Sequence, residues 1–331
     1  MKITQLLPAV AAVALLLTAC GTTEDTTSGE PETSADPAAG EPITLTDARG
    51  EEITLDGPAV RVAGTEWNVV EYLVSLGIQP VGVSDIEGYN TWVSSEKLDE
   101  SATDIGTRGE PSLDALAGLD LDAVFVTDAL IEGAVEQIED SGIPVIVVPG
   151  GDSTDPIGTM FENLDLVAKA TGTEDEAADL RADFDDAVAE GKEAVEAAGA
   201  AGQAVAFSDA YDTGSAISIR PFPSGSLVAA VLEEIGLPSA WGPEIEGDPV
   251  YGLGQTDVEG LTNLADVPFW YIANDDTSPD PYTEGLAGNA VWNSLPFVQS
   301  GQVHRFPDSI WMFGGPASME QVIDAAVDAL G

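Results

Sequence analysis

The 331-residue chain carries 59 acidic residues against 10 lysines and arginines, which gives a formal net charge of -49. Ten scattered cations cannot form the basic surface that nucleic-acid recognition needs, so that function class is excluded. Hydrophobic residues make up 44% of the chain, so the acidity does not indicate disorder, and the length is sufficient for two domains with separate cores.

Residues 1–19 have the pattern of an export signal, in which Lys2 precedes an apolar run that is too short to span a bilayer comfortably. Small residues then lead into Cys20, and the motif "LTAC" resembles a bacterial lipobox. That resemblance implies cleavage before Cys20 and lipidation of its thiol. Because Cys20 is the only cysteine, the chain cannot form an intramolecular disulfide.

Residues 20–42 follow as a stretch rich in threonine, serine, glutamate, proline and glycine, with no aliphatic residue larger than alanine. Such a segment cannot bury a core, which predicts a disordered tether on the lipidated Cys20. The rest of the chain is then displayed just outside a membrane.

Residues 43–172 alternate short β-rich runs with helical patterns, which predicts an α/β lobe with a largely parallel sheet. A hairpin that turns at Arg49 and Gly50 comes first. Strands are predicted within 60–64, 80–85, 122–128 and 144–150, and helices within 68–77, 112–119 and 130–142.

Residues 174–198 contain no proline, are rich in alanine and glutamate, and repeat apolar positions at helical spacing. They predict one long helix, and we assign residues 173–200 to a connection between two lobes.

Residues 201–331 resume the alternation and predict a second α/β lobe. The two halves share an acid followed by two leucines, at 114, 116 and 119 and again at 259, 261 and 264, which favours a duplicated topology. Strands are predicted within 204–209, 215–219, 268–275 and 301–308, and helices within 225–236, 258–264 and 318–330.

Six segments of the chain carry a resemblance to a known family. They are "GIQPVGVSDIEGYNTWV", "IGTRGEPSLDAL", "LEEIGLPSAW", "YGLGQTDVEGL", "VWNSLPFVQSGQVHRFP" and "IWMFGGPASMEQ". With two lobes and one long helix between them, they resemble the substrate-binding lipoproteins of ABC importers of the ferric-siderophore type, hydroxamate or iron-citrate. The resemblance covers residues 43–331 nearly end to end.

The resemblance implies two Rossmann-like lobes with a ligand cleft between them. It also implies a monomeric, lipid-anchored protein on the outer face of the cytoplasmic membrane, which captures a ferric siderophore, foremost of the hydroxamate type. The partners would be a membrane permease and its ATPase. Ferric citrate, cobalamin and haem remain alternative ligands. No cofactor is implied, because the chelator itself holds the iron.

Arg108 is a rare cation in a loop before a predicted helix, where a guanidinium fork suits paired oxygen atoms. The matching arginine of the family contacts the iron-binding oxygens of the siderophore, whereas the alternative is a surface salt bridge. Arg220 is a second rare cation, expected in a loop at a strand end. If both arginines face the cleft, the ligand is expected to carry negative charge.

Four aromatic residues match cleft positions of the family, although each is also compatible with an ordinary core position. Aromatic side chains suit the apolar shell of a chelate whose metal is already wrapped by its own ligands. They are Trp92, Tyr251, Trp311 and Phe313.

Asp114 and Glu259 begin the two similar helical patterns, one in each lobe. In the family, a glutamate at each place meets arginines of the permease, and a solvated helix start is the alternative. Because Asp114 is one methylene shorter than glutamate, Glu110 is a candidate substitute.

A metal site and an enzyme are both disfavoured by the residues present. His304 is the only histidine, lies in a predicted strand, and cannot form an imidazole cluster. The chain contains neither a phosphate-binding GK[ST] loop nor a G-x-S-x-G elbow. A cell-surface enzyme or an adhesive lipoprotein therefore remains only a remote alternative.

Overall fold

A computed structural model describes residues 41–128 and 134–331 and contains two α/β sheets, as the alternating pattern predicted. The predictions for the signal segment, Cys20 and most of the tether concern residues outside this range. So does the beginning of the helix predicted over 130–142. The expected hairpin is present, since β1 (Ile43–Thr46) pairs antiparallel with β2 (Glu52–Leu55), and Gly50 adopts a left-handed φ of 79° in its turn.

The first sheet has the strand order β5-β4-β3-β6-β7, and all of its pairs are parallel. Strands β6 and β7 are buried along their whole length, which fits a parallel sheet covered by helices on both faces. The strands are β3 (Val62–Gly64), β4 (Gly82–Val83), β5 (Thr103–Asp104), β6 (Ala123–Thr127) and β7 (Val145–Val148). The helices are α1 (Trp67–Ser75), α2 (Ile86–Trp92), α3 (Leu113–Ala117) and α4 (Val135–Asp140).

The second sheet has the order β11-β10-β8-β9, in which β9 runs antiparallel to β8 and the other pairs are parallel. The two sheets therefore differ in strand order and direction, and the predicted duplication holds only for the general α/β layout. The strands are β8 (Ala206–Asp212), β9 (Ile217–Pro221), β10 (Phe269–Tyr271) and β11 (Val303–Arg305). The helices are α7 (Leu227–Glu234) and α8 (Pro296–Gln299), with short helical turns at Gly260–Asn263, Pro281–Gly285 and Trp292–Ser294.

Two expectations for this lobe are corrected. Arg220 lies within β9 and not in a loop at a strand end, because the sheet continues through the antiparallel pairing with β8. The helix predicted over 258–264 is only a 3-10 turn, since Gly260 and Asn263 are weak helix formers and Leu264 is already extended. The predicted similarity survives in the burial of Leu116 and Leu261.

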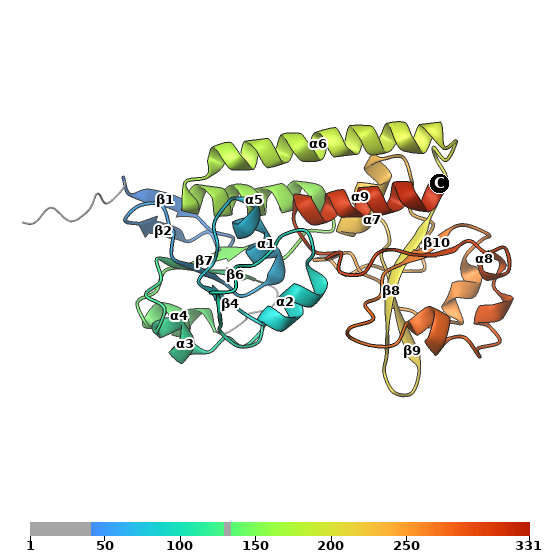
Figure 1. Ribbon diagram of the computed structural model, residues 1–331, viewed down its shortest axis with the longest axis horizontal. Coiled ribbons are helices and arrows are strands. Elements are labelled where there is room, and N and C mark those ends of the chain that lie inside the picture. Colours follow the sequence, from blue (N-terminus) through green and yellow to red (C-terminus); the bar gives the residue numbers. More distant parts are fainter. Residues whose placement is uncertain (1–40, 129–133) are drawn as a thin grey trace, which may run out of the picture. The chain divides into compact units, whose positions relative to one another are not determined.

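The predicted long helix is confirmed as α6 (Glu174–Ala197), which connects the part of the chain that contains the first sheet to the part that contains the second. Helix α6 packs against α5 (Pro156–Thr171) and α9 (Pro316–Leu330), and Figure 1 shows α5 and α9 one after the other along the length of α6. At Gly191 the approach to α9 is close, because a β-carbon there would lie 2.6 Å from Ile323 Cγ2. No helix within the described ranges is long and apolar enough to cross a bilayer.

Helix α5 was not predicted, although its ends carry recognisable signals. The Asp155 side chain accepts a hydrogen bond from Gly158, Pro156 occupies the first turn, and Gly172 ends the helix with a φ of 71°. Aspartate before proline at the start and glycine after the end are typical helix boundaries.

Glu71 on α1 connects the two lobes through the beginning of α9. Its Oε1 accepts a hydrogen bond of 2.9 Å from the Ser318 backbone, and its Oε2 accepts one of 2.7 Å from the Ser318 hydroxyl. Helix α9 has no capping side chain of its own, because Gly315 occupies the N-cap position. Burial raises the pKa of the Glu71 carboxyl to about 7, although the bonds from Ser318 oppose that rise.

The stability of the protein is expected to depend on pH through Glu71. The usual pKa of 4.5 rises to about 7 on folding, so the folded chain holds this proton more tightly. The contribution of the protonated Glu71 to stability is complete when the pH is below the pKa of the unfolded chain, and it is lost as the pH rises through 7. The free energy of unfolding, measured in urea at pH 5 and at pH 8, should fall between these pH values by up to about 3 kcal/mol more in the wild type than in Glu71→Gln. This difference corresponds to about 1.4 kcal/mol per pKa unit.

Glu190→Gln is the matched control, because Glu190 is an exposed acid on α6 and its replacement removes the same charge. That variant should keep the pH dependence of the wild type. An unchanged pH dependence in Glu71→Gln would show that the Glu71 pKa is not raised.

Candidate functional site

A pocket of about 340 Å³ lies between residues of the two lobes. All six residues that the sequence analysis proposed for ligand binding line it, so the structure brings Trp92, Arg108, Arg220, Tyr251, Trp311 and Phe313 together. Four further lining residues escaped the sequence analysis, namely Glu66, Trp67, Asn68 and Leu253.

The strand order of the first sheet explains the position of the pocket. From β3 the chain adds β4 and β5 on one side of the sheet, and from β6 it adds β7 on the other side. Ligands of open α/β sheets bind outside the carboxyl ends of the strands at such a point, here between β3 and β6. Glu66, Trp67 and Asn68 lie shortly after β3, which ends at Gly64. An acid and a tryptophan shortly after a buried strand could therefore have indicated pocket residues from the sequence.

Arg108 is held by one acid and two aromatic rings. Its Nη1 donates a hydrogen bond of 3.2 Å to Glu66 Oε2. Its guanidinium carbon lies 4.1 Å from the centre of the Trp67 ring and 5.6 Å from that of Trp311, within cation–π range. This arginine therefore pairs with an acid of the pocket lining, and not with an acid on the outer surface, which was the alternative.

Glu66 is a buried acid, with 5% of its surface exposed. Burial raises the pKa of its carboxyl to about 7, and the charge of Arg108 is the main influence that opposes this rise. A hydrogen bond from the Trp67 backbone lowers the Glu66 pKa further, whereas the negative charge of Asp85 raises it. The Glu66 carboxyl therefore changes its charge near neutral pH.

Arg220 forms a second pair with an acid. Positions 209 and 220 face each other across the antiparallel strands β8 and β9. Arg220 Nε donates to Asp209 Oδ1 at 2.9 Å, and Nη2 donates to the other carboxylate oxygen. Burial raises the pKa of Asp209, and Arg220 opposes that rise. Both arginines line the pocket, yet each is paired with an acid, so the expectation of a negatively charged ligand does not follow.

Aromatic rings in contact with one another make up much of the pocket lining. The ring centres of Trp67 and Trp311 are 4.8 Å apart, and those of Trp311 and Phe313 are 5.1 Å apart. Tyr251 extends this set of rings, with its ring centre 5.5 Å from that of Phe313, and Trp92 approaches Trp311 at 6.4 Å. Burial raises the pKa of the Tyr251 hydroxyl, which therefore stays protonated.

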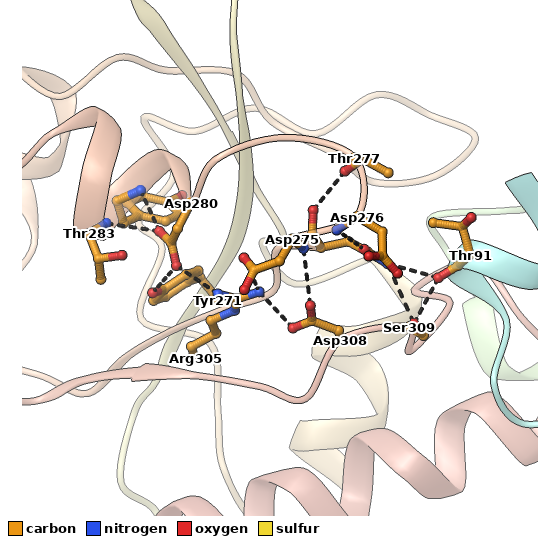
Figure 2. Close-up of polar contacts among 12 residues, drawn as sticks. Thr91, Tyr271, Asp275, Asp276, Thr277, Asp280, Thr283, Arg305, Asp308 and Ser309 are labelled. Carbon is orange, nitrogen blue, oxygen red and sulfur yellow. Dashed lines mark hydrogen bonds and ion pairs between the residues drawn. The ribbon is translucent and has the colours of Figure 1, made fainter.

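Hydrogen bonds between the lobes position Trp92 beside Trp311. The carbonyl oxygen of Thr91 accepts a bond of 2.7 Å from the Ser309 hydroxyl and one of 2.8 Å from Asn274 Nδ2. Figure 2 shows Ser309 directed at Thr91. Thr91 immediately precedes Trp92, and Ser309 lies two residues before Trp311, so this contact brings the two rings together.

Arg305 stabilises the loop that carries Ser309. Its guanidinium pairs with Asp275 at 2.8 Å, Asp308 at 2.6 Å and Asp280 at 3.3 Å, as Figure 2 shows. The Tyr271 hydroxyl also donates to Asp280, at 2.8 Å. This arginine therefore ties the segment after β10 to the segment after β11, outside the pocket.

The remaining predicted residues lie away from the pocket. Asp114 is exposed in the first turn of α3, Glu110 is exposed in the loop before that helix, and Glu259 is exposed at the start of the 3-10 turn. His304 lies in β11, as predicted, with its ring centre 6.2 Å from that of Phe306. Within residues 41–128 and 134–331, no three histidine, cysteine or acidic side chains are arranged to hold a metal ion.

Comparisons with known proteins agree with this geometry. The family model described as "Periplasmic binding protein" matches residues 62–310. The iron(3+)-hydroxamate-binding protein FhuD of Escherichia coli is 25% identical over 276 residues, which cover 82% of this chain and 87% of that protein. The probable siderophore-binding lipoprotein YfiY of Bacillus subtilis is 22% identical and covers 91% of this chain and 89% of its own length.

Solved structures have the same fold. The siderophore-binding protein FhuD of Vibrio cholerae, bound to Fe3+-Desferal, aligns with a TM-score of 0.70 and 25% identity. The alignment covers 82% of this chain and 97% of that protein. The Staphylococcus aureus protein SirA, in complex with staphyloferrin B, aligns with a TM-score of 0.68 and 21% identity, over 87% of this chain and 97% of that one.

Proposed function

This chain belongs to the periplasmic binding protein family, and we propose that it is the extracytoplasmic substrate-binding component of an ABC importer. Its ligand in this proposal is a ferric siderophore, foremost of the hydroxamate type, which it delivers to a membrane permease for iron uptake. The family consists of binding proteins and not of enzymes, so no catalytic role is assigned.

The observation that carries the proposal is the composition of the pocket. An aromatic surface formed by Trp67, Trp311 and Phe313 suits the apolar exterior of a wrapped chelate, and Arg108 offers a donor to its oxygen atoms. The names of the Escherichia coli and Vibrio cholerae relatives, a hydroxamate-binding and a Desferal-bound protein, support the hydroxamate type. Ferric citrate, cobalamin and haem belong in the same binding panel as alternatives.

Arg108→Ala is expected to weaken binding of a ferric hydroxamate roughly ten- to a hundredfold. A charged hydrogen bond typically contributes about 1.5–3 kcal/mol, and about 1.4 kcal/mol is a factor of ten. Arg108→Lys should restore only part of the affinity, because an ammonium group lacks the planar fork. Quenching of tryptophan fluorescence measures this, since three tryptophans line the pocket.

Arg181→Ala is the matched control. Arg181 also pairs with an acid, Asp165 at 3.0 Å, and lies over an aromatic ring, Phe161 at 3.9 Å, but it does not line the pocket. Full affinity in Arg108→Ala would remove Arg108 from the binding site.

The lipid anchor is a further part of the proposal, supported by the lipobox-like motif that ends in Cys20 and by the name of the Bacillus subtilis relative YfiY, a probable siderophore-binding lipoprotein. Cys20→Ala should leave the precursor uncleaved or release the protein from the membrane, because the thiol is the point of attachment. Membrane fractionation and the mass of the mature protein measure this outcome. Normal membrane attachment of the variant would contradict the anchor.

Asp114 and Glu259 are proposed to dock the permease, one from each lobe, because both are exposed and neither lines the pocket. Asp114→Lys and Glu259→Lys should leave chelate affinity unchanged but lower uptake into vesicles that contain the permease and ATPase, since a reversed charge repels a basic partner surface. Glu190→Lys, on exposed α6, is the control. Equal uptake by all three variants would contradict the docking assignment, with Glu110 as the next residue to test.

A further inference from the structure

Each of the two arginines that line the pocket is paired with an acid. Arg108 pairs with Glu66, and Arg220 pairs with Asp209, so each cation of the pocket has its own acid. Glu66 lines the pocket and Asp209 does not, and the lining residues other than Arg108, Arg220 and Glu66 carry no charged side chain. An acidic group also lies behind the first pair, because the negative charge of Asp85 acts on Glu66. With Glu66 ionised, as it is above pH 7, the two arginines and their partner acids together carry no net charge.

A paired guanidinium still donates hydrogen bonds. Arg108 contacts Glu66 through Nη1, and Arg220 contacts Asp209 through Nε and Nη2, whereas each guanidinium has five N–H donors. The pocket can therefore donate hydrogen bonds to the oxygen atoms of a chelate that carries no negative charge. A polyanion would meet the Glu66 carboxylate in the lining and would also lie near Asp209, which pairs with Arg220 but does not line the pocket, in a partly dry space where like charges repel more strongly than in water.

We propose that Glu66 and Asp209 determine specificity, by making the pocket select ferric chelates of zero or positive net charge over polyanionic ones. This inference rests on the proposed siderophore function and narrows its ligand class. A tris-hydroxamate neutralises ferric iron, whereas a tris-catecholate or a citrate complex keeps negative charge. The net charge of -49 on the whole chain acts in the same direction at long range.

A matched pair of ligands tests the inference. Ferrioxamine B carries a free ammonium group, and succinylation of its amine replaces that group by a carboxylate while the iron centre is retained. Ferrichrome, a neutral tris-hydroxamate, and ferric enterobactin, a tris-catecholate polyanion, widen the range of charge. Dissociation constants at low salt and at about 1 M salt separate the two sources of selectivity, because high salt screens surface charges and affects partly buried pairs much less.

The wild type should bind ferrioxamine B and ferrichrome more tightly than the two anionic chelates, and part of this preference should persist at high salt. Glu66→Gln and Asp209→Asn are isosteric and leave one arginine without its counter-charge. Each should reduce the preference roughly tenfold, the effect of about 1.4 kcal/mol from one charge. Asp165→Asn is the control, since Asp165 pairs with Arg181 outside the pocket, and it should keep the full preference.

A change of pH offers a second test of the charge selection. The charged and titratable groups around the Glu66 carboxyl are Arg108, Asp85 and Tyr251. Since the Glu66 pKa is about 7, lowering the pH from 8 to 6 should protonate it and reduce the preference in the wild type, but not in Glu66→Gln.

The outcomes separate the two proposals. If the wild type binds none of the four chelates, the siderophore function fails. If it binds the anionic chelates as tightly as the others at high salt, or if both isosteric variants keep the wild-type preference, the function stands and the charge selection is overturned.

Discussion

Glu71 of α1 accepts hydrogen bonds from the backbone and the side chain of Ser318, and it thereby fixes the beginning of α9 against α1. Two of the aromatic residues that line the pocket lie near this contact, since Trp67 begins α1 and Trp311 shortly precedes α9. A shift of one helix along the other would separate these two rings, whose centres lie 4.8 Å apart. The shape of the pocket thus depends on a fully buried carboxylate that is not part of its lining.

The hydrogen bonds around Thr91 act in the same way at the end of α2. They bring Ser309, and with it the segment that contains Trp311, against the end of that helix. Together with α6, which packs on both α5 and α9, these contacts hold the aromatic residues of both lobes before a ligand arrives. Binding to such a prearranged surface requires little ordering of side chains, which removes part of the entropic cost of association.

Electrostatics sets a second constraint on this pocket. A charged group that is partly removed from water is costly unless it is paired, and both arginines are paired with acids of low exposure. In a chain with 59 acids such partners are abundant, and the pairing turns two rare cations into hydrogen-bond donors without net charge. A hydroxamate chelate of ferric iron, which is itself neutral, fits these conditions better than an anionic one.

The sequence by itself determined the α/β class, the long helix α6 and the six pocket residues named in advance. Periodicity and β-rich runs are local properties, and the six family-like segments are contiguous, so both can be read without knowledge of which segments meet. Helix α5 carried comparable local signals in Asp155, Pro156 and Gly172, and its omission was an error of interpretation.

Only the tertiary structure decided which acid pairs with which arginine. Glu66 and Arg108 are 42 residues apart and meet because they follow β3 and β5, two strands of one parallel sheet whose carboxyl ends lie at the same edge. Asp209 and Arg220 meet because β9 turns back antiparallel on β8, a strand direction that its residues alone did not indicate. Any of 59 acids could have been the partner from composition alone. The net charge at the pocket depends on which acid lies beside each arginine. That is decided by contacts between segments that only the fold brings together.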